Sequence, residues 1–189
     1  MSVRSQEILK ELRLTPLWRH RVEETINNIA KTPSSSVTKK EDRNFQILHF
    51  DWAQLEENVA GCTSCSLCQD RTKTVFGAGD KNADWLFIGD VPSTEEGAQG
   101  EPFVGPSGEL LDNMLEAVSL KEGNNIYIAN IVKCSPLGNR NLDHSEALEC
   151  EPFLIRQIEL IKPKLIIALG EVAAQNLLGT SAAIDSLRG

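Results

Sequence analysis

Three short apolar runs constrain the fold of this chain more than any other feature of its sequence. Each run is nearly continuous in apolar residues, as in a strand buried on both faces, and the runs cover residues 83–90, 125–132 and 163–170. Apolar residues then recur with the period of a helix over residues 107–118, with Ser107 as N-cap, and over residues 145–161 and 171–178. Strands that alternate with helices pair in parallel, with helices on both faces. We therefore predict a three-layer α/β/α fold with a central parallel sheet.

The first 50 residues differ from the rest in charge and pattern. They hold nine Lys or Arg and six Asp or Glu, a net charge of +3, whereas residues 51–189 hold ten and twenty-one, a net charge of −11. Apolar spacing predicts an N-terminal helical extension over residues 1–30, and the polar, turn-rich residues 31–50 predict a flexible linker. The α/β domain then covers residues 51–189. Its negative charge argues against a nucleic-acid surface there, because phosphate contacts need clustered cations.

Five cysteines form the second pattern of the sequence. Cys62, Cys65 and Cys68 lie within seven residues, and Cys134 and Cys150 follow far along the chain. Because there is no run of 18 apolar residues and no cleavable apolar leader, we expect a cytoplasmic protein with no membrane span and with reduced thiols. The odd count also disfavours a disulfide framework. The spacing leaves open a zinc site, an iron–sulfur site and simple burial of the thiols.

Two strand ends point to a functional crevice. Ligands of an open parallel sheet bind beyond the carboxyl ends of the strands. The first strand ends at Asp90, and a long loop rich in Gly and Pro follows it up to residue 108. Loops of this length at such a position are usually functional. The second strand ends near Asn130. We therefore expect Asp90 and Asn130 to face one crevice.

Four blocks of the sequence resemble the family 4 uracil-DNA glycosylases in order and spacing. They lie within residues 62–189, about two-thirds of the chain: CTSCSLCQDRTKTVFGAG, IGDVPSTEEGAQGEPFVGPSGELL, NIVKCSPLGNR and EPFLIRQIELIKPKLIIALGEVAAQNLLG. The resemblance implies a structural [4Fe–4S] cluster, and the cysteines that match its ligands are Cys62, Cys65, Cys134 and Cys150. Cys68 is left outside the cluster. The preference for iron–sulfur over zinc comes from this resemblance and not from the spacing.

The resemblance also implies a uracil pocket in the crevice. Phe103 matches the aromatic residue on which the flipped base stacks, and Asn130 matches the amide that reads uracil. Gly89, Asp90 and Val91 match the stretch that surrounds the base. The Asp90 carboxylate would orient the attacking water and stabilise positive charge on the sugar. Each residue has a simpler interpretation too: Asp90 as the cap of a turn, Phe103 as a core aromatic and Asn130 as a partner of loop backbone.

The implied activity is hydrolysis of the N-glycosidic bond of uracil in DNA, which leaves an abasic site for base-excision repair. The implied partner is DNA containing uracil, single- or double-stranded, bound by a monomer. One alternative is a catalytically inactive iron–sulfur module of the same fold that binds DNA or a protein. A zinc-stabilised α/β domain is the third hypothesis.

Two features depart from the family pattern. The family loop commonly reads Gly-Glu-x-Pro-Gly, whereas residues 89–93 read GDVPS, so the Asp90 carboxylate reaches about 1 Å less far, and misplacement on that scale can cost on the order of 100-fold in rate. The chain also ends at Gly189, before the His-Pro-Ser loop of the family, and its histidines lie outside that motif: His20, His49 and His144. We therefore expect a C-terminally incomplete sheet in a truncated or diverged member.

Overall fold

The computed structural model describes residues 35–188 apart from residues 122, 137, 139 and 141. The helical extension expected over residues 1–30 lies outside this part of the chain. The described residues form a four-stranded sheet in the order β1-β3-β2-β4. None of the helices in the described part is long and apolar enough to cross a membrane.

The three predicted strands are present and run parallel. They are β2 (Trp85–Gly89), β3 (Ile126–Asn130) and β4 (Leu165–Leu169). β2 lies between the other two and pairs in parallel with both, with Gly89 opposite Asn130 on one side and opposite Leu169 on the other. The carboxyl ends of all three strands therefore meet at one end of the sheet, as the sequence predicts.

A fourth strand makes the sheet mixed, which corrects the prediction of a purely parallel one. β1 (Ala78–Gly79) pairs with β3 in the antiparallel direction, with Ala78 opposite Ile128. Two residues are too few to show an alternating pattern, so the sequence carries no strand signal here. Gly79 has φ +120°, and a Cβ at this position would collide with the Ile126 carbonyl oxygen. Glycine therefore allows β1 to approach β3 closely.

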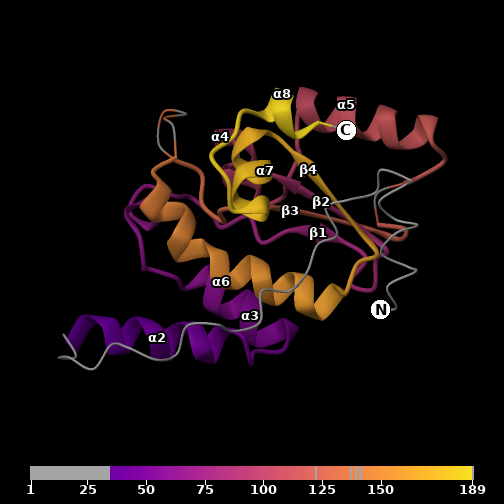
Figure 1. Cartoon of the computed structure of the whole chain (residues 1–189). Coiled ribbons are helices and arrows are strands. Elements are labelled where there is room, and N and C mark those ends of the chain that lie inside the picture. The colour runs from indigo at the N-terminus through magenta and orange to yellow at the C-terminus, as the bar shows by residue number, and fades with distance from the viewer. Residues whose placement is uncertain (1–34, 122, 137, 139, 141, 189) are drawn as a thin grey trace, which may run out of the picture. The chain divides into compact units, whose positions relative to one another are not determined.

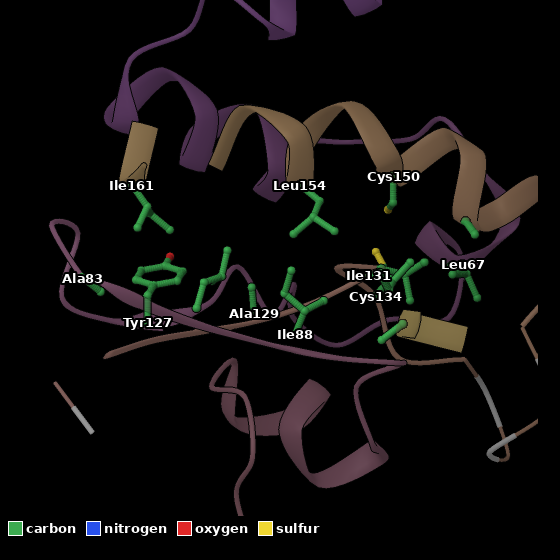
Figure 2. Close-up of a cluster of buried hydrophobic side chains, with 14 residues drawn as sticks. Leu67, Ala83, Ile88, Tyr127, Ala129, Ile131, Cys134, Cys150, Leu154 and Ile161 are labelled. Carbon is green, nitrogen blue, oxygen red and sulfur yellow. The ribbon is translucent and has the colours of Figure 1, made fainter. Parts of the chain in front are cut away.

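Helices cover both faces of the sheet, which confirms the three-layer architecture (Figure 1). α5 (Pro106–Ala117) covers one face, where Leu111 and Leu115 pack against Phe87, Ile126 and Ile128. α6 (His144–Ile161) and α7 (Glu171–Leu178) contribute to the core on the other face. The members of that core that Figure 2 labels include Ile88, Tyr127, Ala129, Leu154 and Ile161. Successive strand residues thus enter opposite cores, which explains why each strand reads as a continuous apolar run.

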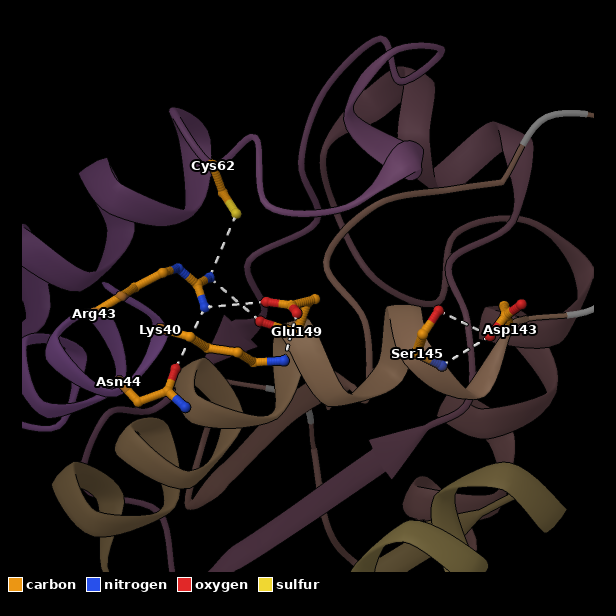
Figure 3. A network of polar contacts seen from close by, with 7 residues as sticks. All are labelled: Lys40, Arg43, Asn44, Cys62, Asp143, Ser145 and Glu149. Atoms are coloured by element: carbon orange, nitrogen blue, oxygen red, sulfur yellow. Dashed lines mark hydrogen bonds and ion pairs between the residues drawn. The ribbon is translucent and has the colours of Figure 1, made fainter. Parts of the chain in front are cut away.

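The helix boundaries follow local capping signals, with one correction. Asp143 is the N-cap of α6, where its side chain accepts a hydrogen bond from the Ser145 N–H at 2.8 Å, close to the predicted start (Figure 3). Ser107 was expected to cap α5, but this prediction is wrong. The N-cap is Gly105 with φ 80°, and Pro106 takes the first helical position. A proline there has its φ preset for a helix and needs no N–H.

A helix also takes the place of most of the predicted linker. α2 (Ser35–Ile47) and α3 (Trp52–Ala60) both contact α6. Ile47 is buried with Leu55, Val59 and Phe153 in a small third core. Lys40 and Arg43 form ion pairs with Glu149 on α6, at 2.6 and 3.6 Å. Two basic residues of the predicted linker, Lys40 and Arg43, therefore have a tertiary partner, which a local reading of the sequence cannot show.

The remaining short helices are η1 (Ser66–Cys68), α4 (Thr94–Gln99) and α8 (Ile184–Leu187). β4 is an edge strand and is less buried than β3: Leu165 is 45% exposed, whereas every side chain of β3 is buried. α5 also presents an exposed apolar row, formed by Leu110, Met114 and Val118. The two inner strands, β2 and β3, are consequently the most buried part of the sheet. Their carboxyl ends carry the candidate site.

Candidate functional site

Gly89, Asn130 and Phe103 converge at the carboxyl ends of β2 and β3. Gly89 and Asn130 end neighbouring strands in register, and Phe103 comes from the loop between α4 and α5. A Cβ on Gly89 would collide with Asn130 Oδ1 and would lie 2.9 Å from two carbons of the Phe103 ring. The amide and the aromatic ring thus both lie against one glycine. These three residues form the candidate site, at the end of the sheet where the sequence predicts a crevice.

The Asn130 side chain is buried with an unused hydrogen-bond donor. Asn130 is 2% exposed, and its Nδ2 has no hydrogen-bond partner among the described residues. A buried N–H group without an acceptor costs about 1–3 kcal/mol, so natural proteins rarely keep one without a reason. The simpler interpretation, that this side chain satisfies loop backbone, does not account for Nδ2. The donor is instead suited to an acceptor atom of a ligand.

Phe103 is held in an unusual backbone conformation. Its φ is +52°, a region that residues other than glycine seldom occupy. Its N–H donates a hydrogen bond to Glu96 Oε1 at 2.6 Å, and a Cβ on Gly108 would collide with its carbonyl oxygen. The ring is partly buried against the core under α5. Phe103 is therefore both a partial core residue and one wall of the crevice.

The Asp90 and Val91 side chains contact other parts of the fold. The Asp90 Oδ1 accepts a hydrogen bond from the Ala173 N–H at 2.6 Å, in the first turn of α7. Burial raises the pKa of Asp90, while hydrogen bonds from the Ala173 and Val172 backbone oppose the rise. Val91 packs against the core under α6. The interpretation of Asp90 as a cap is thus supported, but the helix that it caps is α7 and not its own turn.

All five cysteines are free thiols, and Cys134 and Cys150 are buried together in the core under α6, against which Cys65 packs. Cys62 and Cys65 come from the segment after α3, and Figure 2 shows the sulfurs of Cys134 and Cys150 pointing toward each other. Burial first, and then the neighbouring Cys134 and Cys65, raise the pKa of Cys150 to about 12. Burial likewise raises the pKa of Cys134, with further contributions from Cys65 and Cys62. Thiols buried in this way resist ionisation unless a positive group joins them.

Several donors point at these sulfurs. Arg71 Nη1 lies 3.3 Å from Cys134 Sγ, and Arg43 Nη2 lies 3.7 Å from Cys62 Sγ (Figure 3). The Lys133 backbone N–H donates to the Cys150 sulfur. Charged and neutral N–H donors stabilise thiolates. Among the described residues, however, no three His, Cys, Asp or Glu side chains are grouped as they are around a single metal ion.

Glu146 ties the cysteine segment to α6. Its carboxylate, 4% exposed, accepts hydrogen bonds from Arg140 Nη1 and Nη2 at 2.9 and 2.6 Å, and from Ser66 Oγ at 2.5 Å. The Arg140 guanidinium first, and then the Ser66 hydroxyl, lower the pKa of Glu146 from 4.5 to about 2. Ser66 lies next to Cys65, so this carboxylate fixes the cysteine segment over the start of α6.

Glu146→Gln is expected to destabilise the fold by about 1–3 kcal/mol at pH 7, because it weakens hydrogen bonds to a buried charge. A carboxyl whose folded pKa is lowered stabilises the fold above its unfolded pKa, and the contribution is lost as pH falls through the folded pKa. The difference between wild type and variant in free energy of unfolding should therefore shrink as pH falls from 4.5 toward 2. Urea unfolding of both proteins at each pH measures this difference. A difference that is constant with pH would contradict the assignment.

Comparison with known proteins places this fold and crevice in a definite class. The family model for the uracil DNA glycosylase superfamily matches residues 76–188. The type-4 uracil-DNA glycosylase of Sulfurisphaera tokodaii is 40% identical over 117 residues, which are 62% of this chain and 53% of that protein. The type-4 enzyme of Archaeoglobus fulgidus is 39% identical over 117 residues, 62% of this chain and 58% of the relative. That of Thermotoga maritima is 38% identical over 136 residues, 71% of this chain and 70% of the relative.

The chain therefore belongs to the uracil-DNA glycosylase superfamily and, within it, to the type-4 family, which confirms the resemblance seen in the sequence. It spans somewhat more than half the length of the first two relatives named above.

The sequence did not single out two residues that shape the loop between β2 and α5, which we call the crevice loop. These residues are Glu96 and Gly108. The Ser93-x-x-Glu96 spacing of a capping box was a visible signal for Glu96.

Proposed function

We propose that this chain carries the uracil-reading crevice of a uracil-DNA glycosylase, which hydrolyses the bond between uracil and deoxyribose and leaves an abasic site. The unpaired, buried Nδ2 of Asn130 beside Gly89 and Phe103 is the observation that carries this proposal. The substrate would be single- or double-stranded DNA containing uracil, bound by a monomer in the cytoplasm. The relatives named as type-4 uracil-DNA glycosylases support the same activity.

The crevice provides the interactions that uracil needs. A glycosylase extrudes the target base from the helix and reads its Watson–Crick edge in a pocket. In this proposal the extruded uracil stacks on Phe103, Asn130 Nδ2 donates to uracil O4, and Oδ1 accepts from N3–H. Cytosine carries an amino group in place of O4 and an acceptor in place of N3–H, so both interactions are reversed and the base is rejected. The missing side chain at Gly89 leaves room for the Asn130 amide and the Phe103 ring to lie side by side at the end of β2.

We propose a positioning role for Asp90 in place of direct activation of water. Its carboxylate is engaged with the first turn of α7, and it thereby connects the end of β2 to the segment after β4. A Cβ on Gly170 would collide with this carboxylate, so the glycine leaves room for it. Asp90→Asn keeps the shape and one acceptor oxygen. If Asp90 only positions α7, the variant should keep uracil excision within about tenfold of wild type, whereas loss of a water-activating base costs about 100- to 10,000-fold.

We propose that Cys62, Cys65, Cys134 and Cys150 hold a [4Fe–4S] cluster. These thiols, with Arg71, Arg43 and the Lys133 N–H directed at them, suit a group of several positive irons. The preference for a cluster over a zinc ion rests on the resemblance to the type-4 family. When bound, the cluster would supply a cross-link between the end of α3, the end of β3 and α6, and no redox chemistry is needed for hydrolysis.

The experiment that tests this function uses a labelled duplex with one U·G pair, followed by alkali to cut abasic sites. We expect cleavage at uracil and none in matched duplexes with T·G or C·G pairs. Phe103→Ala should lower the single-turnover rate by about 5- to 150-fold, because stacking of a base on an aromatic ring is worth about 1–3 kcal/mol. Absence of cleavage by folded wild-type protein, or equal rates for wild type and variant, would contradict the proposal.

Gly89→Ala is expected to lower uracil excision by about 10- to 100-fold while the protein still folds. The added methyl group collides with Asn130 Oδ1 and crowds the Phe103 ring, so both crevice walls must shift by a fraction of an ångström or more. Gly61→Ala is the matched control, because a methyl group there meets only the Glu57 carbonyl oxygen, at 3.6 Å. Equal single-turnover rates for the two variants would argue that the crevice does not lie at Gly89.

A further inference from the structure

We infer that Glu96 is a positioning residue that clamps the crevice loop and fixes the Phe103 ring where the extruded base stacks, an inference that rests on the proposed function. Glu96 is one of the charged residues that are buried in the described part of the chain, with 6% of its surface exposed. Within the described part of the chain it forms no ion pair. Burial of a carboxylate without a cation is costly unless hydrogen bonds satisfy its oxygens. The partners of these oxygens therefore indicate what the residue does.

Both carboxylate oxygens of Glu96 bind backbone of the crevice loop. Oε2 accepts from the Ser93 N–H at 2.6 Å, and Oε1 accepts from the Phe103 N–H at 2.6 Å. Ser93 is the N-cap of α4, and Phe103 lies seven residues beyond Glu96, after the left-handed turn at Gly100. A single carboxylate thus joins the two ends of the loop that follows β2.

The second of these hydrogen bonds exceeds what a helix cap requires. In a capping box the third helical residue only has to reach back to the N-cap N–H. Gln54 of α3 shows this simpler arrangement: it is exposed, and its side-chain oxygen accepts only from the Asp51 N–H, at 3.0 Å. Glu96 makes the same bond and adds the one to Phe103. Compared with Gln54, Glu96 therefore does more than cap, as Glu146 of α6 also does through Arg140 and Ser66.

Phe103 needs such a restraint because its backbone is strained. A non-glycine residue with φ near +52° lies in a sparsely populated region and persists only when its surroundings impose it. The two restraints next to the Phe103 backbone are the Glu96 carboxylate on its N–H and the close approach of Gly108 to its carbonyl oxygen. Without the first restraint the residue can relax, and its ring leaves Gly89 and Asn130. Displacement of a reacting group by about 1 Å can cost on the order of 100-fold.

The test compares Glu96→Gln with Glu95→Gln, its exposed neighbour in the same helix. Glutamine keeps one oxygen but offers an NH2 group to one of the two N–H donors, so one of the two backbone bonds must break. We expect Glu96→Gln to lower single-turnover uracil excision by about tenfold or more, and Glu95→Gln to stay within twofold. In a Phe103→Ala background, Glu96→Gln should add less than a twofold loss, because the ring that it positions is gone. An equal loss with and without Phe103, or no loss from Glu96→Gln in an active protein, would overturn the inference.

A second measurement keeps the inference separate from the proposed activity. Amide hydrogen exchange followed by NMR should show a protected Phe103 N–H in wild type and in Glu95→Gln. Its exchange should be at least tenfold faster in Glu96→Gln, beyond the change in global stability that urea unfolding of the same variant measures. A Phe103 N–H that exchanges freely in wild type would overturn the clamp whether or not the protein excises uracil. Protection without any excision would instead leave the clamp intact and contradict the proposed function.

Discussion

Asn130→Asp should lower uracil excision by about 100-fold or more while the shape of the side chain stays the same. The substitution replaces the unused Nδ2 donor with an oxygen, so the crevice can no longer donate to uracil O4 and presents two acceptors to it. Removal of one positioned donor from an active site typically costs about 100- to 1,000-fold, and repulsion between oxygens adds to this. The rate should be measured under single-turnover conditions at saturating DNA, where it reports the base-reading step.

The matched control is Asn113→Asp, the same change on the exposed face of α5. We expect it to leave the rate within about twofold of wild type, because a surface substitution of this kind changes little else. Circular dichroism melting of both variants separates loss of function from loss of fold. An Asn130→Asp protein that folds and excises uracil at the wild-type rate would show that the side-chain amide is not the reading group.

Cys150→Ser should have the largest effect on stability. The thiol is buried in α6, and it faces Cys134 in the group that we assign to the cluster. Binding of a structural metal group counts toward folding because the unfolded chain lacks the site, and it is worth on the order of 10 kcal/mol in small zinc domains. We expect loss of the brown absorbance near 400 nm and at least about 3 kcal/mol of destabilisation in urea unfolding of anaerobically purified protein.

Cys68→Ser is the control for this change, since Cys68 lies in the same segment but outside the assigned set. It should keep both the absorbance and the stability within about 1 kcal/mol of wild type. If Cys68→Ser lost the absorbance and Cys150→Ser kept it, the ligand set would be wrong. A colourless wild-type protein that contains zinc would contradict the cluster itself and favour the zinc-stabilised domain.

The strands could be predicted from sequence because their burial is two-sided. Ile88 faces the core under α6 and Phe87 the core under α5, so each strand reads as a nearly continuous apolar run of a length typical of strands. β1 could not be predicted, because two residues carry no period. α2 was missed because some of the contacts that hold it are with residues more than a hundred positions away, as in the Lys40–Glu149 ion pair.

The site was predicted in part. The position of Asn130 at a strand end follows from the fold, and its role follows from the family resemblance. The direction of a side chain depends on tertiary contacts, and for that reason the sequence could not show that the Asp90 carboxylate binds the first turn of α7. The same holds for Glu96: the spacing from Ser93 predicts a cap, but the hydrogen bond to Phe103 depends on the path of the loop after Gly100.

A crystal structure of the chain with free uracil would test the uracil-reading crevice most directly. We expect uracil to lie in the crevice, stacked on the Phe103 ring, with O4 within hydrogen-bond distance of Asn130 Nδ2 and its edge against Gly89. Uracil bound at another place, or a crevice that stays empty at a uracil concentration that inhibits excision, would contradict the proposed function.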